Sequence, residues 1–324
     1  MKETDSTLVR GRFAPTPSGR MHLGNVLCAL LAWLSVRAQR GVMLLRIEDL
    51  DSERCPLSYA KALEDDLRWL GLDWDEGGLD GTDKSGGSCI QSRRTAHYEK
   101  TLEALRACAV LYPCFCSRAE LHAAQAPHLS DGRVLYAGTC KALTPEEARL
   151  KLALRPAAIR IAVPDEVVCF TDLCRGEYEE NLKKDCGDFI LKRSDGVFAY
   201  QLAVAADDME MGVTEVVRGA DLLFSAARQI WLIGLLGGRP PVYGHIPLLL
   251  APDGRRLSKR DADLDLSALK KRFSAEQILG LLAHLCGLTE TEEPISAKEL
   301  IPLFSWDKLK KENIRLSASF YASL

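Results

Sequence analysis

One polar stretch near the start of the chain has the residue types of a phosphate-binding loop. It runs from Arg12 to Asn25 and contains two prolines, a serine, His22 and Gly24. The stretch lies between a strand pattern at 8–13 and an apolar helical pattern at 26–39. Unpaired backbone N–H groups and the dipole at a helix N-terminus attract anions. We therefore predict that this loop binds a phosphate group.

A second candidate phosphate site lies in a basic loop late in the chain. Gly254 opens a turn, and the following loop contains Ser258 and Lys259 among further cations. A basic run is usually a solvated surface. This one directly follows the strand expected at 245–250, at the strand end where α/β proteins bind ligands. A phosphate clamp is the prediction.

Two charged residues stand at the ends of further strand patterns. Glu48 follows the buried strand expected at 42–47, and Arg218 ends the strand expected at 214–218. The first strand, helix and second strand read as a βαβ unit, whose ligands lie beyond the carboxyl ends of the strands. There Glu48 can bind an ammonium group, a ribose or a metal. A helix N-cap is the alternative.

A group of cysteines has the chemistry of a metal site. Cys114 and Cys116 form a C-x-C pair, and Cys140 follows downstream. Three thiolates supply three of the four ligands of a tetrahedral zinc site, and a closed site of this kind is structural. Idle thiols are the alternative. The fourth ligand has three candidates, His122, His128 and Tyr136.

Composition indicates an ordinary globular protein. The chain has 42 Lys and Arg against 45 Asp and Glu, so bulk charge neither indicates nor excludes a nucleic acid partner. The first residues lack the apolar segment of a signal peptide, and no apolar run is long enough for a membrane span. Eleven scattered cysteines, an odd number, indicate reduced thiols. We expect a cytoplasmic protein without membrane contact.

The rest of the chain alternates helix and strand patterns, which predicts an α/β fold with a parallel, Rossmann-like sheet. The glycine-rich segment 75–88 reads as an exposed loop, and Ser194-Asp-Gly196 as a hairpin turn. The residues after 262 read as mostly helical. Further helices are expected at 58–70, 94–109, from 200 and at 225–236, and strands at 159–163, 166–171, 189–192 and 197–200.

The two phosphate-binding stretches together resemble the signature pair of the class I aminoacyl-tRNA synthetases. His22-Leu-Gly-Asn25 resembles the HIGH sequence, and Arg256-Leu-Ser-Lys-Arg260 resembles KMSKS. Segments 12–19, 45–51 and 217–221 resemble the catalytic domain of glutamyl-tRNA synthetases. The resemblance implies a catalytic domain in two halves, 8–110 and 158–262, a zinc-binding insertion at 111–157 and a helical C-terminal module at 263–324.

Departures from that pattern narrow the resemblance to the glutamyl-Q tRNA(Asp) synthetase family. The residues after the second signature are too few for an anticodon-binding region, Asn25 replaces the last histidine of HIGH, and Val204 replaces a usual asparagine. Members of this family activate glutamate and attach it to queuosine in the anticodon of tRNA(Asp). Their fourth zinc ligand is a tyrosine. The implied set, with one zinc per chain, is Cys114, Cys116, Tyr136 and Cys140.

The resemblance also implies a role for each site residue. Arg12 and Arg218 offer forks to the carboxylates of L-glutamate, and Glu48 takes its ammonium group. His22 and Lys259 stabilise the charge that develops on ATP, which brings Mg²⁺ with it. The implied glutamate site is Arg12, Phe13, Ala14, Pro15, Thr16, Glu48, Tyr200 and Arg218, and the implied ATP site is His22, Gly24, Asn25, Ser258 and Lys259.

The expected function is ATP-dependent, tRNA-independent activation of glutamate by a monomer, followed by transfer to tRNA(Asp) that carries queuosine. Two alternatives stay open. One is a short glutamyl-tRNA synthetase that charges the 3′ end of tRNA(Glu). The other, motivated by Asn25, is a non-catalytic paralogue that binds nucleotide or tRNA. A Rossmann oxidoreductase is disfavoured because no G-x-G-x-x-G follows the first strand.

Overall fold

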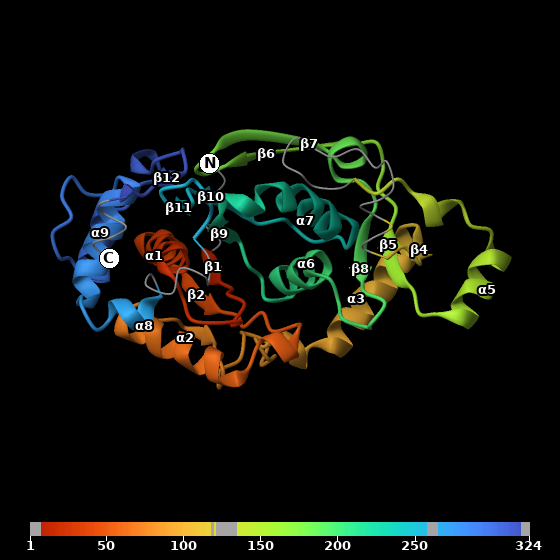
Figure 1. Ribbon diagram of the computed structural model, residues 1–324, viewed down its shortest axis with the longest axis horizontal. Helices are drawn as coiled ribbons and strands as arrows, with labels where there is room; N and C mark the ends of the chain where they lie inside the picture. The colour runs from red at the N-terminus through yellow and green to blue at the C-terminus, as the bar shows by residue number, and fades with distance from the viewer. Residues whose placement is uncertain (1–7, 118–119, 121–134, 258–264, 319–324) are drawn as a thin grey trace, which may run out of the picture.

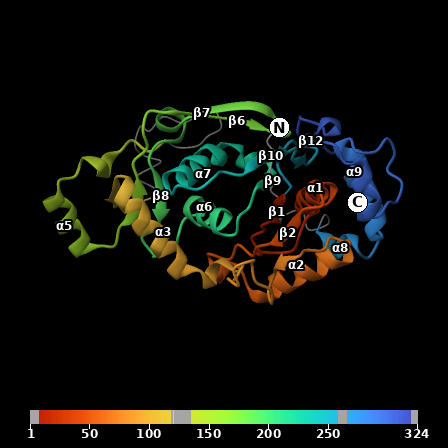
Figure 2. The ribbon, with the colours of Figure 1, turned by 180° about the vertical axis from the view of Figure 1, so that it is seen from behind.

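The computed structural model describes residues 8–117, 120, 135–257 and 265–318. These residues form an elongated molecule (Figure 1). The parallel sheet and the C-terminal helices lie toward one end, and α5 (Pro145–Leu154) lies at the other. The same arrangement is visible from behind (Figure 2).

A five-stranded parallel sheet organises the larger half of the protein. Its strand order is β10-β9-β1-β2-β3. From β1, the chain adds β2 and β3 on one side of the sheet and later adds β9 and β10 on the other side. Such a reversal leaves a crevice beside the carboxyl ends of the two strands where it occurs, here β1 and β9. The predicted parallel α/β fold is confirmed. The strands are β1 (Arg10–Phe13), β2 (Val42–Leu45), β3 (Glu76–Gly77), β9 (Glu215–Gly219) and β10 (Val242–Ile246).

Helix α1 (Leu23–Ala38) covers one face of this sheet and is almost entirely buried. Its close approach depends on Gly11, where an added Cβ would lie 2.3 Å from Cγ2 of Val36. The apolar helix joins α2 (Leu57–Trp69) and the C-terminal helices in one hydrophobic cluster. The C-terminal helices are α8 (Leu266–Leu269), α9 (Ala275–Cys286) and α10 (Ala297–Leu300).

A second hydrophobic cluster fills the other half of the protein. It packs α6 (Tyr200–Glu210) and α7 (Leu223–Leu235) against α3 (Thr95–Cys108) and a small antiparallel sheet. The order of that sheet is β4-β5-β8. Its strands are β4 (Leu111–Cys114), β5 (Ala158–Ile161) and β8 (Phe189–Lys192).

A two-stranded antiparallel ribbon lies beside β10 and α7, along one long side of the molecule (Figure 1). It consists of β6 (Val167–Asp172) and β7 (Gly176–Asn181). The first strand ends on Asp172, which is buried. Single-turn 3₁₀ segments occur at 52–54, 91–93, 139–142, 220–222, 301–303 and 306–308, and a π turn at 182–186.

Three expectations for secondary structure were wrong, and one strand was missed. The segment 75–88 is not only a loop, because β3 forms the edge of the main sheet there. The strand expected at 245–250 is interrupted at Pro247, after which β11 (Leu249–Leu250) pairs with β12 (Ile314–Arg315) instead. Strand β7 was not predicted, and residues 197–200 contribute one bridge, Lys192 to Phe198, rather than a strand.

Within the described part of the chain, no helix combines the length and the apolar character needed to cross a bilayer. Helix α1, which is strongly apolar, has 16 residues.

Candidate active site

A pocket of about 770 Å³ opens at the carboxyl ends of β1 and β9. The loop after β1, the start of α1 and the loop after β9 form most of its wall. Eleven of the predicted site residues line it together: Arg12, Phe13, Ala14, Pro15, Thr16, His22, Gly24, Asn25, Glu48, Tyr200 and Arg218. Arg256 and Leu257 add the start of the basic loop. Ser258 and Lys259 lie outside the described residues.

The loop after β1 delivers His22 to the N-cap of α1. Nδ1 of His22 accepts hydrogen bonds from the backbone N–H groups of Gly24 at 3.1 Å and Asn25 at 3.4 Å. Oδ1 of Asn25 accepts in return from the N–H of His22 at 3.1 Å. An imidazole whose Nδ1 accepts carries its proton on Nε2 when it is neutral. The cap therefore makes Nε2 of His22 a donor at the wall of the pocket.

Gly24 allows the imidazole to lie against the first turn of α1. A Cβ at this position would stand 3.0 Å from Cε1 and 3.1 Å from Nδ1 of His22. Gly219, on the opposite wall, is similarly restricted, because its Cβ would meet Oδ1 of Asp221 at 2.6 Å. Asp221 in turn accepts a hydrogen bond from Nη1 of Arg256 at 2.7 Å. Side chains at these two glycine positions would therefore clash with residues that line the pocket.

Arg12 presents an open guanidinium to the pocket. Its Nη1 donates to the carbonyl of Val217 at 3.3 Å, and its Nε lies 3.6 Å from Oδ1 of Asp208. Among the described residues Nη2 has no hydrogen-bond partner. A buried guanidinium with unused N–H groups has a strong demand for an anion. Arg12 can therefore bind a carboxylate in the pocket.

Arg218 lies across the pocket from a different strand and is more fully bonded. Nη1 donates to Oε1 of Gln229 at 2.7 Å and to the hydroxyl of Tyr200 at 3.4 Å. Nη2 donates to the carbonyl of Leu222 at 3.2 Å, and Nε donates to Nε2 of His245 at 3.0 Å. Only one N–H group of Nη2 has no partner among the described residues. This guanidinium is fixed in orientation before any ligand binds.

Glu48 supplies a carboxylate at the same end of the pocket. Its Oε1 accepts from Nη2 of Arg46 at 3.1 Å, and Nη1 of Arg46 also donates to Asp208 at 2.6 Å. Burial raises the pKa of Glu48 above its ordinary value, although Arg46 and Arg12 oppose the shift. A ligand cation next to this carboxylate would favour its charged form.

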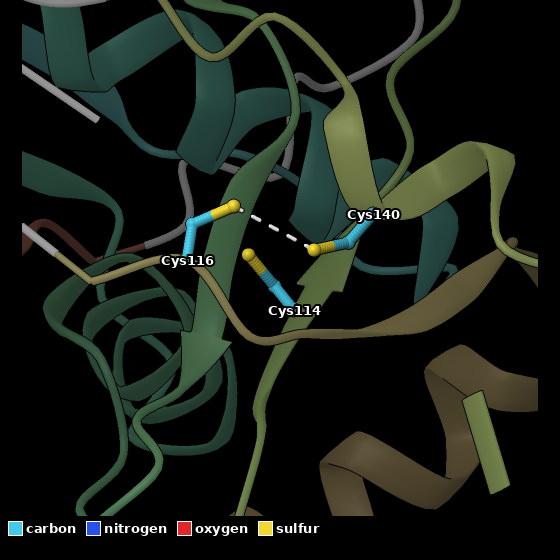
Figure 3. A group of neighbouring side chains, drawn as sticks. All are labelled: Cys114, Cys116 and Cys140. Atoms are coloured by element: carbon cyan, nitrogen blue, oxygen red, sulfur yellow. Dashed lines mark hydrogen bonds between the residues drawn. The ribbon is translucent and has the colours of Figure 1, made fainter. Parts of the chain in front are cut away.

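Three thiols gather beside the end of β4 (Figure 3). The Sγ atoms of Cys114, Cys116 and Cys140 lie within 4.8 Å of one another. Those of Cys116 and Cys140 are 3.6 Å apart. Tetrahedral zinc with bonds of about 2.3 Å separates two sulfur ligands by about 3.8 Å. The cluster has the dimensions of a metal site.

Tyr136 completes the cluster with an oxygen. Its hydroxyl lies 3.6 Å from Sγ of Cys114 and 3.9 Å from Sγ of Cys116, and it accepts from the N–H of Cys140 at 2.8 Å. Nε of Arg160 donates to Sγ of Cys114 at 3.2 Å. Burial opposes ionisation of Cys114, but Arg160 and further hydrogen bonds outweigh burial and lower its pKa. The other two candidate ligands, His122 and His128, lie outside the described residues.

Comparison with known proteins identifies the family. The model of the class I tRNA synthetases (E and Q), catalytic domain, matches residues 8–317. The chain belongs to this synthetase family. It is therefore a ligase of the aminoacyl-tRNA synthetase type, as the sequence predicted.

Three relatives show how far the similarity of this synthetase extends. A glutamyl-Q tRNA(Asp) synthetase of Symbiobacterium thermophilum is 48% identical over 97% of this chain and 98% of that protein. Another of that name, from Nitratidesulfovibrio vulgaris, is 46% identical over 92% of both chains. A crystal structure of a glutamate tRNA ligase from Elizabethkingia meningosepticum in complex with its amino acid superposes with a TM-score of 0.81. It is 28% identical, over 97% of this chain and 68% of that one.

Sequence reasoning missed the buried residues that support the synthetase pocket. Arg46 and Asp208 form an ion pair behind Arg12 and Glu48, and both are almost fully buried. One signal was available, because Arg46 interrupts the apolar strand pattern at 42–47. A charge inside a buried strand requires a buried partner. The identity of that partner depends on tertiary structure.

Proposed function

We propose that this synthetase activates glutamate with ATP in the absence of tRNA and transfers it to queuosine in the anticodon of tRNA(Asp). The observation that carries this function is the pocket, which is lined by two arginines, a buried glutamate and the His22 cap. The two relatives named for this activity support it, because they match nearly all of the chain.

Glutamate fits the charges of the side chains that line the pocket. It brings two carboxylates and one ammonium group, and the pocket offers Arg12, Arg218 and Glu48. We propose that each arginine takes one carboxylate and that Glu48 takes the ammonium group. Thr16 and Tyr200 supply hydroxyl groups beside them, and Phe13, Ala14 and Pro15 close the wall.

ATP fits the part of the pocket that is lined by the start of α1. The N-terminus of this helix attracts phosphate, and Nε2–H of His22 can donate to a phosphate oxygen. We assign Gly24, Asn25 and the loop residues Ser258 and Lys259 to ATP as well. Mg²⁺ accompanies ATP in this proposal and neutralises part of the phosphate charge when bound.

The first chemical step joins the two substrates inside the pocket. An oxygen of the glutamate α-carboxylate attacks the α-phosphorus of ATP, and the bond from that phosphorus to the bridging oxygen breaks. Pyrophosphate leaves with the electron pair, and glutamyl-adenylate remains. The protein needs no covalent intermediate. It acts by fixing the carboxylate and by stabilising the charge that develops on phosphate oxygens.

The second step transfers the glutamyl group. A hydroxyl of queuosine attacks the acyl carbonyl, the bond to the adenylate oxygen breaks, and AMP leaves. Transfer can be tested with radioactive glutamate, ATP and tRNA(Asp) that carries or lacks queuosine. Label is expected only with queuosine, and it should persist on tRNA(Asp) that lacks its terminal adenosine. Label on the terminal adenosine of tRNA(Glu) would establish the alternative synthetase instead.

Activation can be tested separately from transfer. Glutamate-dependent exchange of pyrophosphate into ATP without tRNA is the expected result. Its absence, together with intact ATP binding, would support a non-catalytic paralogue. Lys259→Ala should slow this exchange more than it weakens glutamate binding.

We propose further that the cysteine cluster holds one structural zinc through Cys114, Cys116, Tyr136 and Cys140. Three thiols and a phenol at these distances suit zinc, and four protein ligands leave no position for substrate. We also propose that the enzyme works as a monomer in the cytoplasm, where its proposed tRNA substrate occurs. Sedimentation of the purified protein tests the monomer.

A further inference from the structure

Three buried side chains from three strands form a linear chain of hydrogen bonds that ends at the pocket. Asp172 ends β6 of the ribbon, His245 lies in β10, and Arg218 lies in β9. Oδ2 of Asp172 is 2.6 Å from Nδ1 of His245, and Nε2 of His245 is 3.0 Å from Nε of Arg218. Their exposed fractions are 2%, 0% and 3%.

The partners on each side determine which nitrogen of His245 carries the proton. Nε of Arg218 can only donate, so Nε2 of His245 must accept. Asp172, as a carboxylate, accepts from Nδ1–H and from the backbone N–H of His245 at 3.1 Å. Burial lowers the pKa of His245 to about 4, with Asp172 opposing this shift and Arg218 adding to it. The imidazole is therefore neutral, in the Nδ1–H form.

Asp172 is itself held firmly by the backbone of the ribbon turn. Its Oδ1 accepts from the N–H groups of Cys174 at 3.0 Å and Arg175 at 2.9 Å. The carboxylate therefore cannot rotate away from His245 without losing these bonds. The imidazole ring of His245 also stacks on the ring of Tyr243, with the ring centres 5.9 Å apart. The imidazole is fixed in position as well as in protonation.

From this geometry we infer that Asp172 and His245 are positioning residues for Arg218. They hold its Nε so that the remaining donor of the guanidinium faces the substrate carboxylate. The inference rests on the proposed function, because it assumes that Arg218 binds glutamate. Without His245, the guanidinium would have a buried Nε–H with no acceptor and could turn about its last bonds. Glutamate would then meet a less well-oriented cation.

Three variants test the inference by pyrophosphate exchange. His245→Phe keeps an aromatic ring but removes both hydrogen bonds. His245→Gln keeps an acceptor for Arg218. Asp172→Asn keeps the size of Asp172 but places an amide donor opposite Nδ1, which favours the Nε2–H form of His245. That form sets two donors against each other at Arg218. His284→Phe, the same substitution in α9, is the matched control.

His245→Phe and Asp172→Asn should raise the KM for glutamate roughly tenfold to a hundredfold, which is the size expected for a hydrogen bond to a charged group. The KM for ATP should change less than about twofold in both. In His245→Gln the KM for glutamate should stay much closer to the wild-type value than in His245→Phe. A glutamate KM unchanged in His245→Phe would overturn the inference, and so would equal changes in both KM values.

A second measurement reports the protonation of His245 in the wild-type protein, and only its assignment uses a variant. The ¹⁵N spectrum of histidine-labelled wild-type protein should contain the signals of a neutral Nδ1–H imidazole that are absent from the spectrum of His245→Gln. Assignment of His245 as Nε2–H or as imidazolium at pH 7 would overturn the inference. Failure of the proposed function looks different, because the wild-type protein would then show no glutamate-dependent exchange.

Discussion

His22 and Asn25 bind each other across the first turn of α1, each side chain accepting a hydrogen bond from the other's backbone N–H. The relationship gives Asn25 a structural role, because its Oδ1 completes the cap that orients the imidazole. It also commits Nδ1 of His22 to the helix. The catalytic role that we propose for His22 therefore falls to Nε2–H.

His22→Asn should separate stability from activity. Asparagine is a good N-cap and preserves the acceptor for the N–H groups of Gly24 and Asn25, but it lacks the Nε2 donor. The free energy of unfolding should change by less than about 1 kcal/mol. The kcat of pyrophosphate exchange should fall about 10²–10³-fold. Denaturant unfolding measures the stability, and exchange kinetics measure the kcat. A parallel loss of stability and kcat would contradict this role for Nε2.

Glu48→Gln should weaken selection for the ammonium group of glutamate. The substitution keeps the shape of the side chain but leaves the ammonium group without a charged partner. The kcat/KM for glutamate should fall roughly a hundredfold, while the KM for ATP stays the same. Asp49→Asn is the control, since Asp49 bonds Ser92 and does not line the pocket.

Glutarate gives this prediction a second readout. It carries both carboxylates but no ammonium group, so its inhibition constant should not worsen in Glu48→Gln. Weaker inhibition by glutarate in the variant would show that Glu48 acts on the shape of the pocket rather than on the ammonium group.

Cys140→Ala should release the zinc that we propose for the cysteine cluster. Elemental analysis of the wild-type protein should give about one zinc per chain, in agreement with four protein ligands. The variant should give much less, and Cys108→Ala, which changes an exposed thiol outside the cluster, should match the wild type. Pyrophosphate exchange should survive in Cys140→Ala, because the cysteines and the pocket pack in separate hydrophobic cores. Zinc-free wild-type protein would contradict the metal site.

The buried imidazole of His245 should make stability depend on pH. Its pKa is lowered to about 4 in the folded protein from 6.5. Between these values the unfolded chain binds a proton that the folded chain does not, so the free energy of unfolding falls as pH falls. The loss should approach about 3 kcal/mol by pH 4. Denaturant unfolding from pH 7 to pH 4.5 should show a shallower slope in His245→Phe than in the wild type.

The sequence was sufficient for the parts of the protein that repeat a local pattern. Strand, loop and helix between 8 and 39 follow from apolar periodicity and the prolines and glycines of the loop. Glu48 and Arg218 were placed at one edge because each stands at the end of a strand pattern, and Arg12 begins the loop stretch that follows the first strand pattern. Their meeting in one pocket follows from the parallel sheet. The roles assigned to them, and the domain bounds, stay predictions.

The parts that could not be predicted depend on contacts between distant segments. β3 is only two residues long and lies in a glycine-rich segment, so it has no periodicity to detect. Asp172 and His245 lie 73 positions apart and read separately as a turn acid and a strand histidine. Nothing local marks them as a pair. The available sign was a histidine at the start of the otherwise apolar strand expected at 245–250.

The central position of β1 has a consequence for how the protein is made. β1 leaves the ribosome well before its neighbour β9, and the two strands pair through Gly11 and Glu215, which lie 204 positions apart. Closing so long a loop carries a large entropy cost and is slow. A growing chain therefore carries the His22 loop long before the wall with Arg218 exists. The pocket is completed only after most of the protein has been translated.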